Sequence, residues 1–236
     1  MRHERNATSD VNRGGGLMDA RTGKPTAKRP ASQQRDPERT RGAILAAATA
    51  AFSAKGLDGA RVDDIAHRSG VSKRMIYHYF GDKEGLYLAV LEASYAAIRT
   101  AELGLKLSDL GPIDGMRTLV RFTWGYFIAH PEFLSLLGTE NLHRAANLKK
   151  LHRIRELHSP LIGLLSELLA RGEKQTVFRK AVDPMQLYIS IAALGFFYLS
   201  NRHTLSTIFG HDLSAPGALS ERGDHIVEVV LGYLRA

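Results

Sequence analysis

The chain has 236 residues, a net charge of +8 and an isoelectric point near 9.8. Its length allows one larger domain or two small ones, and its hydrophobic content of 44% is ordinary for a globular protein. The positive charge favours a polyanionic partner, which can be DNA or an anionic membrane surface. The absence of cysteine excludes disulfides, thiol catalysis and thiolate metal sites.

Residues 1–36 contain eight Lys or Arg against four Asp or Glu, a net charge of +4, and almost no large apolar side chains. Such a segment cannot bury enough surface to offset the entropy lost on ordering, so we expect a disordered basic arm. Two interpretations stay open: the arm grips DNA phosphates, or it is a solvated tail ahead of a second possible start at Met18. The arm lacks the apolar segment of a secretory signal, and no run in the chain reaches the roughly 18 apolar residues of a membrane span. We therefore expect a cytoplasmic protein without a membrane partner.

A first helix is predicted from Pro37 to Lys55. Proline suits a first helical turn, and Gly56 is a suitable end. The spacing of the apolar residues indicates one packing face, formed by Ile44, Leu45, Ala48, Ala51 and Phe52.

Residues 61–83, RVDDIAHRSGVSKRMIYHYFGDK, predict two short helices joined by a turn. Gly70 breaks the first helix because glycine accepts the left-handed backbone of a tight turn, and Ser72 is a good N-cap for the second. The second helix, residues 73–79, should bury Ile76 and Phe80. It should expose six basic, aromatic or sulfur-containing side chains: Lys73, Arg74, Met75, Tyr77, His78 and Tyr79. This pattern is typical of a helix-turn-helix whose second helix enters the major groove.

The stretch IAHRSGVSKRMIYHYFGDKEGL closely resembles the DNA-binding signature of the TetR family of transcriptional regulators. The preceding RTRGAILAAATAAFSAKGLDGARVDDIA resembles the first helix of that family and its link into the second. The resemblance implies a three-helix DNA-binding domain over residues 37–82. It also implies that residues 83–236 form a domain that binds a small-molecule effector and dimerises.

We expect ten residues to contact DNA. Arg39 lies at the start of the first helix, where the family's first helix approaches the backbone, and a solvated charge is an equally good interpretation. Arg61 stands where the family usually has a capping Ser or Thr, and it could reach a phosphate instead. Asp82 can cap the next helix, so a phosphate can sit at that helix N-terminus beside Lys83. The full set is Arg39, Arg61, Ser72, Lys73, Arg74, Met75, Tyr77, His78, Tyr79 and Lys83.

The remaining chain predicts an all-α second domain. Its expected helices cover residues 83–105, 113–130, 132–142, 147–172, 184–209 and 219–234. Pro160 should kink or break the fourth of these. Asp183 and Pro184 are suitable as the N-cap and first residue of the fifth, and Gly210 as its end.

Aromatic residues interspersed with polar ones suit a pocket with a few orienting contacts, although most buried aromatics are ordinary core. The expected effector-binding residues are Trp124, Phe127, His130, Asn141, Arg144, Phe178, Tyr188, Phe197 and Asn201. Basic residues around 144–155 are interpreted as a solvated surface, or as the source of one side chain that selects an acidic ligand. His152 and Glu156 give only a weak metal signal, so we expect no metal, no cofactor and no catalytic residues.

Two apolar stripes on the last two helices predict a homodimer that forms a four-helix bundle. They consist of Leu187, Ile191, Leu194, Tyr198 and Leu205, and of Ile226, Val229, Val230 and Tyr233. The predicted function is a homodimeric repressor that a small-molecule effector releases from a palindromic double-stranded DNA operator. The alternative is an architectural DNA-binding protein that responds to no effector and has a tightly packed second domain.

Overall fold

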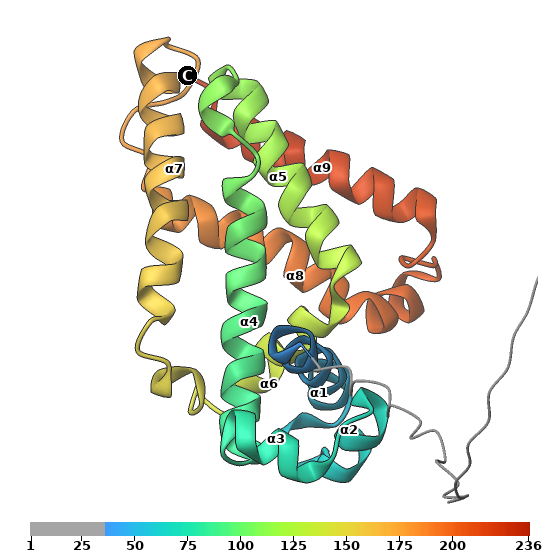
Figure 1. The fold of residues 1–236 in the computed structure, drawn as a ribbon. Helices are drawn as coiled ribbons and strands as arrows, with labels where there is room; N and C mark the ends of the chain where they lie inside the picture. The colour runs from blue at the N-terminus through green and yellow to red at the C-terminus, as the bar shows by residue number, and fades with distance from the viewer. Residues whose placement is uncertain (1–35) are drawn as a thin grey trace, which may run out of the picture. The chain divides into compact units, whose positions relative to one another are not determined.

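The computed structural model describes residues 36–236, apart from the side chains of residues 155 and 157–159. The predicted basic arm falls almost entirely outside the described residues, so its disorder and its role stay predictions. The described part is all-helical, as predicted (Figure 1). Its α-helices are α1 (Pro37–Gly59), α2 (Val62–Ser69), α3 (Lys73–Phe80), α4 (Lys83–Leu103), α5 (Pro112–Ala129), α6 (Pro131–Leu142), α7 (Ile154–Lys174), α8 (Pro184–Phe209) and α9 (Pro216–Leu234). Two 3-10 helices are η1 (Leu107–Asp109) and η2 (Leu148–Lys150). None of the helices in residues 36–236 is long and apolar enough to cross a membrane.

Most helix ends lie where the residues predict them, because each is set by local backbone chemistry. The backbone of Gly56 leaves the helical region with φ +67° and ψ 179°, so the straight part of α1 ends there. Asp82 accepts the N–H of Gly85 at the start of α4, and Asp183 accepts those of Met185 and Gln186 at the start of α8. Gly210 ends α8 in the left-handed conformation.

The long helix expected over residues 147–172 is wrong at its start. The chain forms only η2 there, and α7 begins at Ile154. The backbone reverses just before, since Arg144 and Ala145 both have φ of +57°. The carboxylate of Glu140 then holds the N–H of Leu148 at 2.9 Å. Pro160 does not break the helix, because α7 continues through this residue, and the alternative of a kink there stays a prediction.

The first apolar core lies among α1, α2, α3 and the first half of α4; we call it the N-terminal core. Ile44, Ile65, Ile76 and Tyr87 are fully buried in it, and the rings of Phe52 and Tyr87 meet edge to face at 5.0 Å. These contacts hold α3 on the other two helices, because a buried Ile contributes about 1.5–3 kcal/mol.

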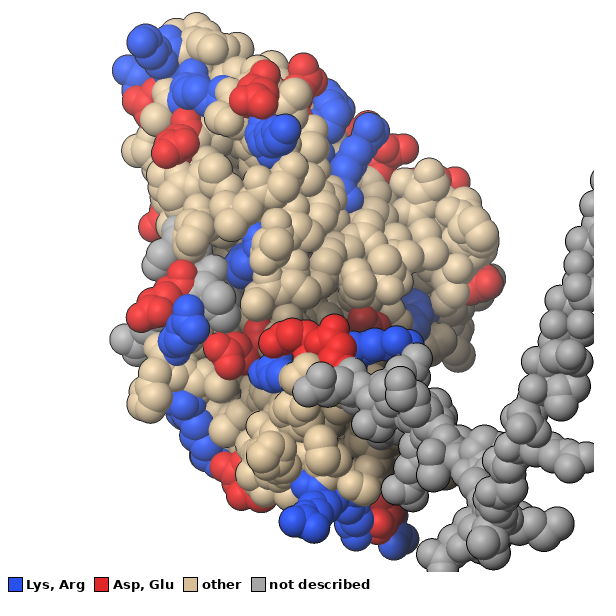
Figure 2. Space-filling view, in the orientation of Figure 1, with Lys and Arg blue, Asp and Glu red and all other residues tan. Residues whose placement is uncertain are grey.

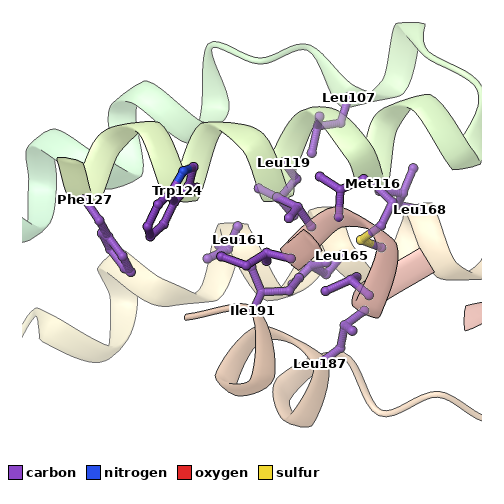
Figure 3. Close-up of a cluster of buried hydrophobic side chains, with 14 of the residues drawn as sticks. Leu107, Met116, Leu119, Trp124, Phe127, Leu161, Leu165, Leu168, Leu187 and Ile191 are labelled. Atoms are coloured by element: carbon purple, nitrogen blue, oxygen red, sulfur yellow. The ribbon is translucent and has the colours of Figure 1, made fainter. Parts of the chain in front are cut away.

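The second core, which we call the C-terminal core, lies among the second half of α4 and helices α5, α7, α8 and α9. Met116 and Leu119 of α5 point toward Leu165 and Leu168 of α7 and toward Ile191 of α8 (Figure 3). Because α4 contributes to both cores, a domain boundary at residue 82 stays a prediction.

Candidate functional site

The turn between α2 and α3 has the backbone that the sequence predicts. Gly70 has φ +67°, where any other side chain would strain the backbone. Two residues later, the hydroxyl of Ser72 accepts the N–H of Met75 at 3.3 Å. This bond fixes the start of α3 at Lys73 and occupies the side chain of Ser72 as a cap.

One face of α3 is buried and the opposite face is exposed. Ile76 is fully buried, whereas Lys73, Arg74, Tyr77 and His78 are exposed as predicted. Met75 and Tyr79, which we also expected to be exposed, are half-buried. The exposed face therefore offers two cations, a phenol and an imidazole, which suit contacts with base edges and phosphates.

Phe80 is half-buried, not buried as predicted, because it packs at the edge of the N-terminal core. The guanidinium of Arg41 on α1 lies 5.4 Å from the centre of its ring. This cation–π contact ties the end of α3 to α1.

Lys73 forms an ion pair with α2. Its ammonium lies 2.8 Å from Asp63, and this contact lowers the pKa of the Asp63 carboxyl and raises the pKa of Lys73. Both groups are exposed, so the pair contributes little to stability. It does orient Lys73 along the α2–α3 junction, where a DNA phosphate would compete with the carboxylate for the ammonium.

Cationic side chains surround α3. Figure 2 shows Lys and Arg side chains, with some acidic side chains among them, at the end of the described part of the chain where α2 and α3 lie in Figure 1. Arg39 and Arg61 are exposed, and Arg61 makes no side-chain cap to α2, which fits the departure noted in the sequence. Lys83 is half-buried and donates to the carbonyl of Asp58 at 3.1 Å. Lys83 thus fastens the start of α4 to the end of α1, and its phosphate contact stays a prediction.

Trp124 and Phe127 of α5, expected in an effector pocket, are both buried in the C-terminal core. The indole N–H of Trp124 donates to the carbonyl of Leu219 at 3.1 Å, and its ring meets that of Tyr198 at 5.6 Å. Gly223 leaves the space for this ring, because a Cβ there would lie 2.8 Å from it. These contacts fasten α5 to α8 and α9, so they give Trp124 a packing role.

The other predicted effector residues lie in different surroundings. Phe178 is buried against Gly172 near the chain terminus, and Phe197 is 60% exposed on α8. Asn141 and Arg144 are exposed at the end of α6, and Asn201 donates to the carbonyl of Phe197 within its own helix. Tyr188 belongs to the polar cluster described next, and the ring of His130 lies 4.1 Å from that of Tyr126 in the same cluster.

A buried polar cluster lies where α4 meets α5, α6 and α8. Arg99 and Glu102 on α4 are 5% and 2% exposed, with a guanidinium nitrogen, Nη1, 2.9 Å from the carboxylate. Nη2 of Arg99 lies 3.4 Å from the hydroxyl of Tyr188 on α8, and its guanidinium lies 5.5 Å from the centre of that ring. We call Arg99, Glu102, Tyr188 and the neighbouring Tyr95 and Tyr126 the Arg99 cluster.

Electrostatics in the Arg99 cluster are dominated by burial. Burial raises the pKa of Glu102 from 4.5 to about 7, and the nearby Arg99 only partly opposes it. Burial likewise raises the pKa of Tyr95 to about 12 and that of Tyr126 above its usual range. The sequence prediction missed Arg99 and Glu102. The sequence signal for them is their position on the apolar face of α4, since Arg99 lies four residues after Tyr95 and Glu102 lies four residues after Ile98.

The outer face of α8 and α9 is apolar and exposed. Ile189, Phe197, Val229 and Tyr233 are exposed, and a groove between the two helices is lined by Leu194, Phe197, Val229 and Tyr233 among others. Five of the nine residues in the predicted dimer stripes are instead buried within the protomer, although two of them, Leu187 and Val230, also line the groove. The five are Leu187, Ile191, Tyr198, Ile226 and Val230. The reason is that α8 is apolar around most of its circumference, so sequence periodicity did not distinguish its inner face from its outer one.

Among the described side chains, no group of three His, Asp or Glu residues is close enough to hold a metal ion. The weak metal signal at His152 and Glu156 therefore gains no support from these residues.

Comparisons with known proteins match both parts of the chain. A model of "Bacterial regulatory proteins, tetR family" matches residues 44–90, and one of "Tetracyclin repressor-like, C-terminal domain" matches residues 112–230. The chain is 39% identical over 204 residues to the HTH-type transcriptional repressor NicS of Pseudomonas putida, across 86% of this chain and 95% of NicS. It is 27% identical over 195 residues to the HTH-type transcriptional regulator RutR of Escherichia coli, across 82% of this chain and 89% of RutR.

Solved structures share the fold. A transcriptional regulator of Streptomyces coelicolor, SCO4942, superposes with a TM-score of 0.63 at 25% identity, over 83% of this chain and 98% of that one. AibR, solved with isovaleryl coenzyme A and operator DNA, superposes with a TM-score of 0.62 at 18% identity, over 80% of this chain and 97% of AibR.

Proposed function

Because the chain belongs to the TetR family and is a helix-turn-helix transcriptional repressor, we propose that it binds a palindromic operator as a homodimer. The protein then leaves the operator when a small molecule binds the C-terminal domain. A cytoplasmic location, with access to DNA, is part of the same proposal. The observation that carries it is the presentation of α3, which is fastened by Ile76 underneath and exposes Lys73, Arg74, Tyr77 and His78.

DNA binding by α3 follows from its chemistry. Arginine and lysine donate to guanine in the major groove and to phosphates, and each good base contact contributes about 1–3 kcal/mol of discrimination. Arg39, Arg61 and Lys83 then act on the backbone, which positions the helix without reading sequence.

The outer face of α8 and α9 supports a two-fold dimer. A free surface that exposes Phe197, Val229 and Tyr233 side by side is unfavourable in water, and a second copy of the same face would cover it. Two α3 helices related by a two-fold axis then read two half-sites of opposite orientation, which gives the operator its palindrome.

Release by an effector needs a mechanical link between the two cores, and α6 supports one. Leu136 of α6 is buried in the N-terminal core, and the hydroxyl of Ser135 donates to the carbonyl of Ser53 on α1. Glu140, also on α6 and buried, accepts the hydroxyl of Tyr87 on α4 at 3.0 Å. A ligand that shifts α6 or α4 would therefore move the helices that carry α3.

The alternative, an architectural protein without an effector, predicts a tightly packed second domain, in which few buried polar groups should lack a partner. Instead, Nε and Nη1 of Arg99 and Oε2 of Glu102 are buried without a hydrogen bond among the described residues. This observation favours the effector-responsive repressor.

Selection from a random double-stranded DNA library tests the proposal. Wild-type protein should enrich an inverted repeat, Arg74→Ala should lose sequence preference, and the exposed Lys180→Ala should behave as wild type. Enrichment of no sequence would support the architectural alternative. Enrichment of a single half-site that one protomer binds tightly would refute the proposed homodimer.

A further inference from the structure

The interior of the C-terminal domain holds an ion pair that is poorly satisfied. Arg99 and Glu102 are almost completely buried, and burying charges is costly unless hydrogen bonds replace their water. Although Nη1 and Oε2 are 2.9 Å apart, their orientation forms no hydrogen bond, and both atoms remain unsatisfied. Neither side chain therefore satisfies the hydrogen-bonding capacity of the other.

The guanidinium has a second edge, formed by Nε and Nη2, that Glu102 does not contact. Nε has no hydrogen-bond partner among the described residues, and Nη2 has only the 3.4 Å contact with the hydroxyl of Tyr188. On a guanidinium, the Nε–H and one Nη–H point the same way and form a fork that two oxygens of one acid accept together. The fork of Arg99 is thus free to take a bidentate anion.

The ring of Tyr188 lies on the guanidinium, and other aromatic rings of the Arg99 cluster pack against Phe133. Tyr95 and Tyr126 lie 5.4 and 6.2 Å from the ring of Phe133 on α6, both edge to face, and Tyr188 approaches from α8. An apolar lining with one or two oriented polar groups is the composition of small-molecule sites. It suits a ligand with an acidic head and an apolar body.

The charge balance selects the kind of anion. Among the described side chains of the cluster, Arg99 is the only cation, and Glu102 sits directly beside it. A phosphate monoester carries up to two negative charges at neutral pH and would be repelled by the ionised form of Glu102, whereas a monocarboxylate carries only one negative charge.

We infer that Arg99 anchors the effector by binding the carboxylate of a small monocarboxylic acid through Nε and Nη2, with the apolar part of that acid against Tyr95, Phe133 and Tyr188. This inference rests on the proposed function, since it names the chemistry of the effector. Binding at Arg99 also reaches the DNA-binding part directly, because Arg99 lies on the same helix as Tyr87 of the N-terminal core.

The test uses the full chain and a panel of acetate, butyrate and benzoate, each beside its neutral amide, in calorimetry and thermal melts. At least one carboxylate should bind and raise the melting temperature, and its amide should not. Arg99→Gln should weaken that binding by about 10- to 100-fold, the loss expected for a charge-assisted hydrogen bond. Arg121→Gln, which removes an exposed arginine paired with Asp224, should leave it unchanged.

Glu102→Gln is a second variant, for which the expected change in carboxylate affinity is opposite to that of Arg99→Gln. It keeps the test possible if Arg99→Gln folds poorly. It removes the competing carboxylate and should tighten carboxylate binding several-fold. The inference is overturned if no carboxylate of the panel binds, if amides bind equally, or if Glu102→Gln weakens binding. Operator binding by the same proteins distinguishes failure of this inference from failure of the proposed function. If wild type binds the operator but no carboxylate affects it, only this inference fails. If wild type binds no operator, the proposed function fails.

Discussion

Glu102 is 2% exposed, and burial raises the pKa of its carboxyl group from 4.5 to about 7 despite the neighbouring Arg99. Folding therefore favours the protonated carboxyl. This contribution to stability is complete below the unfolded pKa, near 4.5, and is lost as the pH rises through about 7. A shift of this size corresponds to roughly 3 kcal/mol at most.

Glu102→Gln should remove this pH dependence, because the amide stays neutral at every pH. The free energy of unfolding of the variant, relative to wild type, should rise by about 1–3 kcal/mol between mildly acidic and mildly alkaline buffer. Urea unfolding at each pH measures the difference, with the exposed Glu173→Gln as the control that shows no trend. A difference that is constant with pH would mean that Glu102 stays ionised beside Arg99.

The structure gives Trp124 a packing role, whereas the sequence predicted a role in effector binding. This residue fills a space left by Gly223 and bonds to Leu219, so Trp124→Ala should cost about 3–5 kcal/mol and lower the melting temperature without any ligand. Phe209→Ala, which truncates an exposed ring, should change the melting temperature little. A stable Trp124→Ala variant that has lost only its response to ligand would place Trp124 in the pocket instead.

At the scale of the helix, α6 belongs to the second half of the chain but completes the N-terminal core. Leu136→Ala should cost about 2–5 kcal/mol and weaken operator binding, although Leu136 is far from α3 in sequence. Leu142→Ala on the same helix is the matched control, because this side chain is 80% exposed. Equal melting curves and equal operator affinity for the two variants would show that α6 does not support the DNA-binding helices.

Helices α2 and α3 should make different kinds of DNA contact, α2 with the phosphate backbone and α3 with the bases. Arg61→Ala, at the start of α2, should weaken binding to all sequences alike and reduce the slope of affinity against salt by about one unit. Arg74→Ala on α3 should instead lower discrimination between operator and random DNA, by about 1–3 kcal/mol. Titrations of both DNAs at several salt concentrations measure this, and the same loss of discrimination in both variants would contradict the division.

The helices and their ends could be predicted from sequence because their causes are local. Gly70, Ser72 and Asp183 act through bonds to residues within a few positions, and those bonds form as expected. The buried face of α3 at Ile76 follows from the same short-range pattern.

The remaining features depend on contacts between distant segments, which no local pattern encodes. The outer face of α8 could not be told from its inner one, since Leu187 and Phe197 are equally apolar but only Leu187 is covered by other helices. Arg99 and Glu102 resemble any surface pair at this spacing until α8 covers them. The short η2 segment stands where a longer helix was expected, and its first residue, Leu148, donates its N–H to Glu140 of another helix.

For the whole molecule, we propose that two copies of the chain meet through α8 and α9. Phe197→Glu places a charge in the middle of the exposed apolar face, and should produce monomers that bind the operator poorly. Leu142→Glu places the same charge on an exposed leucine outside that face, and should leave the assembly unchanged.

The most direct measurement is the mass, by sedimentation, of the complex between the protein and its selected operator. We expect wild type and Leu142→Glu to bind each inverted repeat with an even number of protomers. Phe197→Glu should sediment as a monomer with little operator bound. A single wild-type protomer bound tightly to the operator would contradict the proposed homodimer, as would an unchanged dimer of Phe197→Glu.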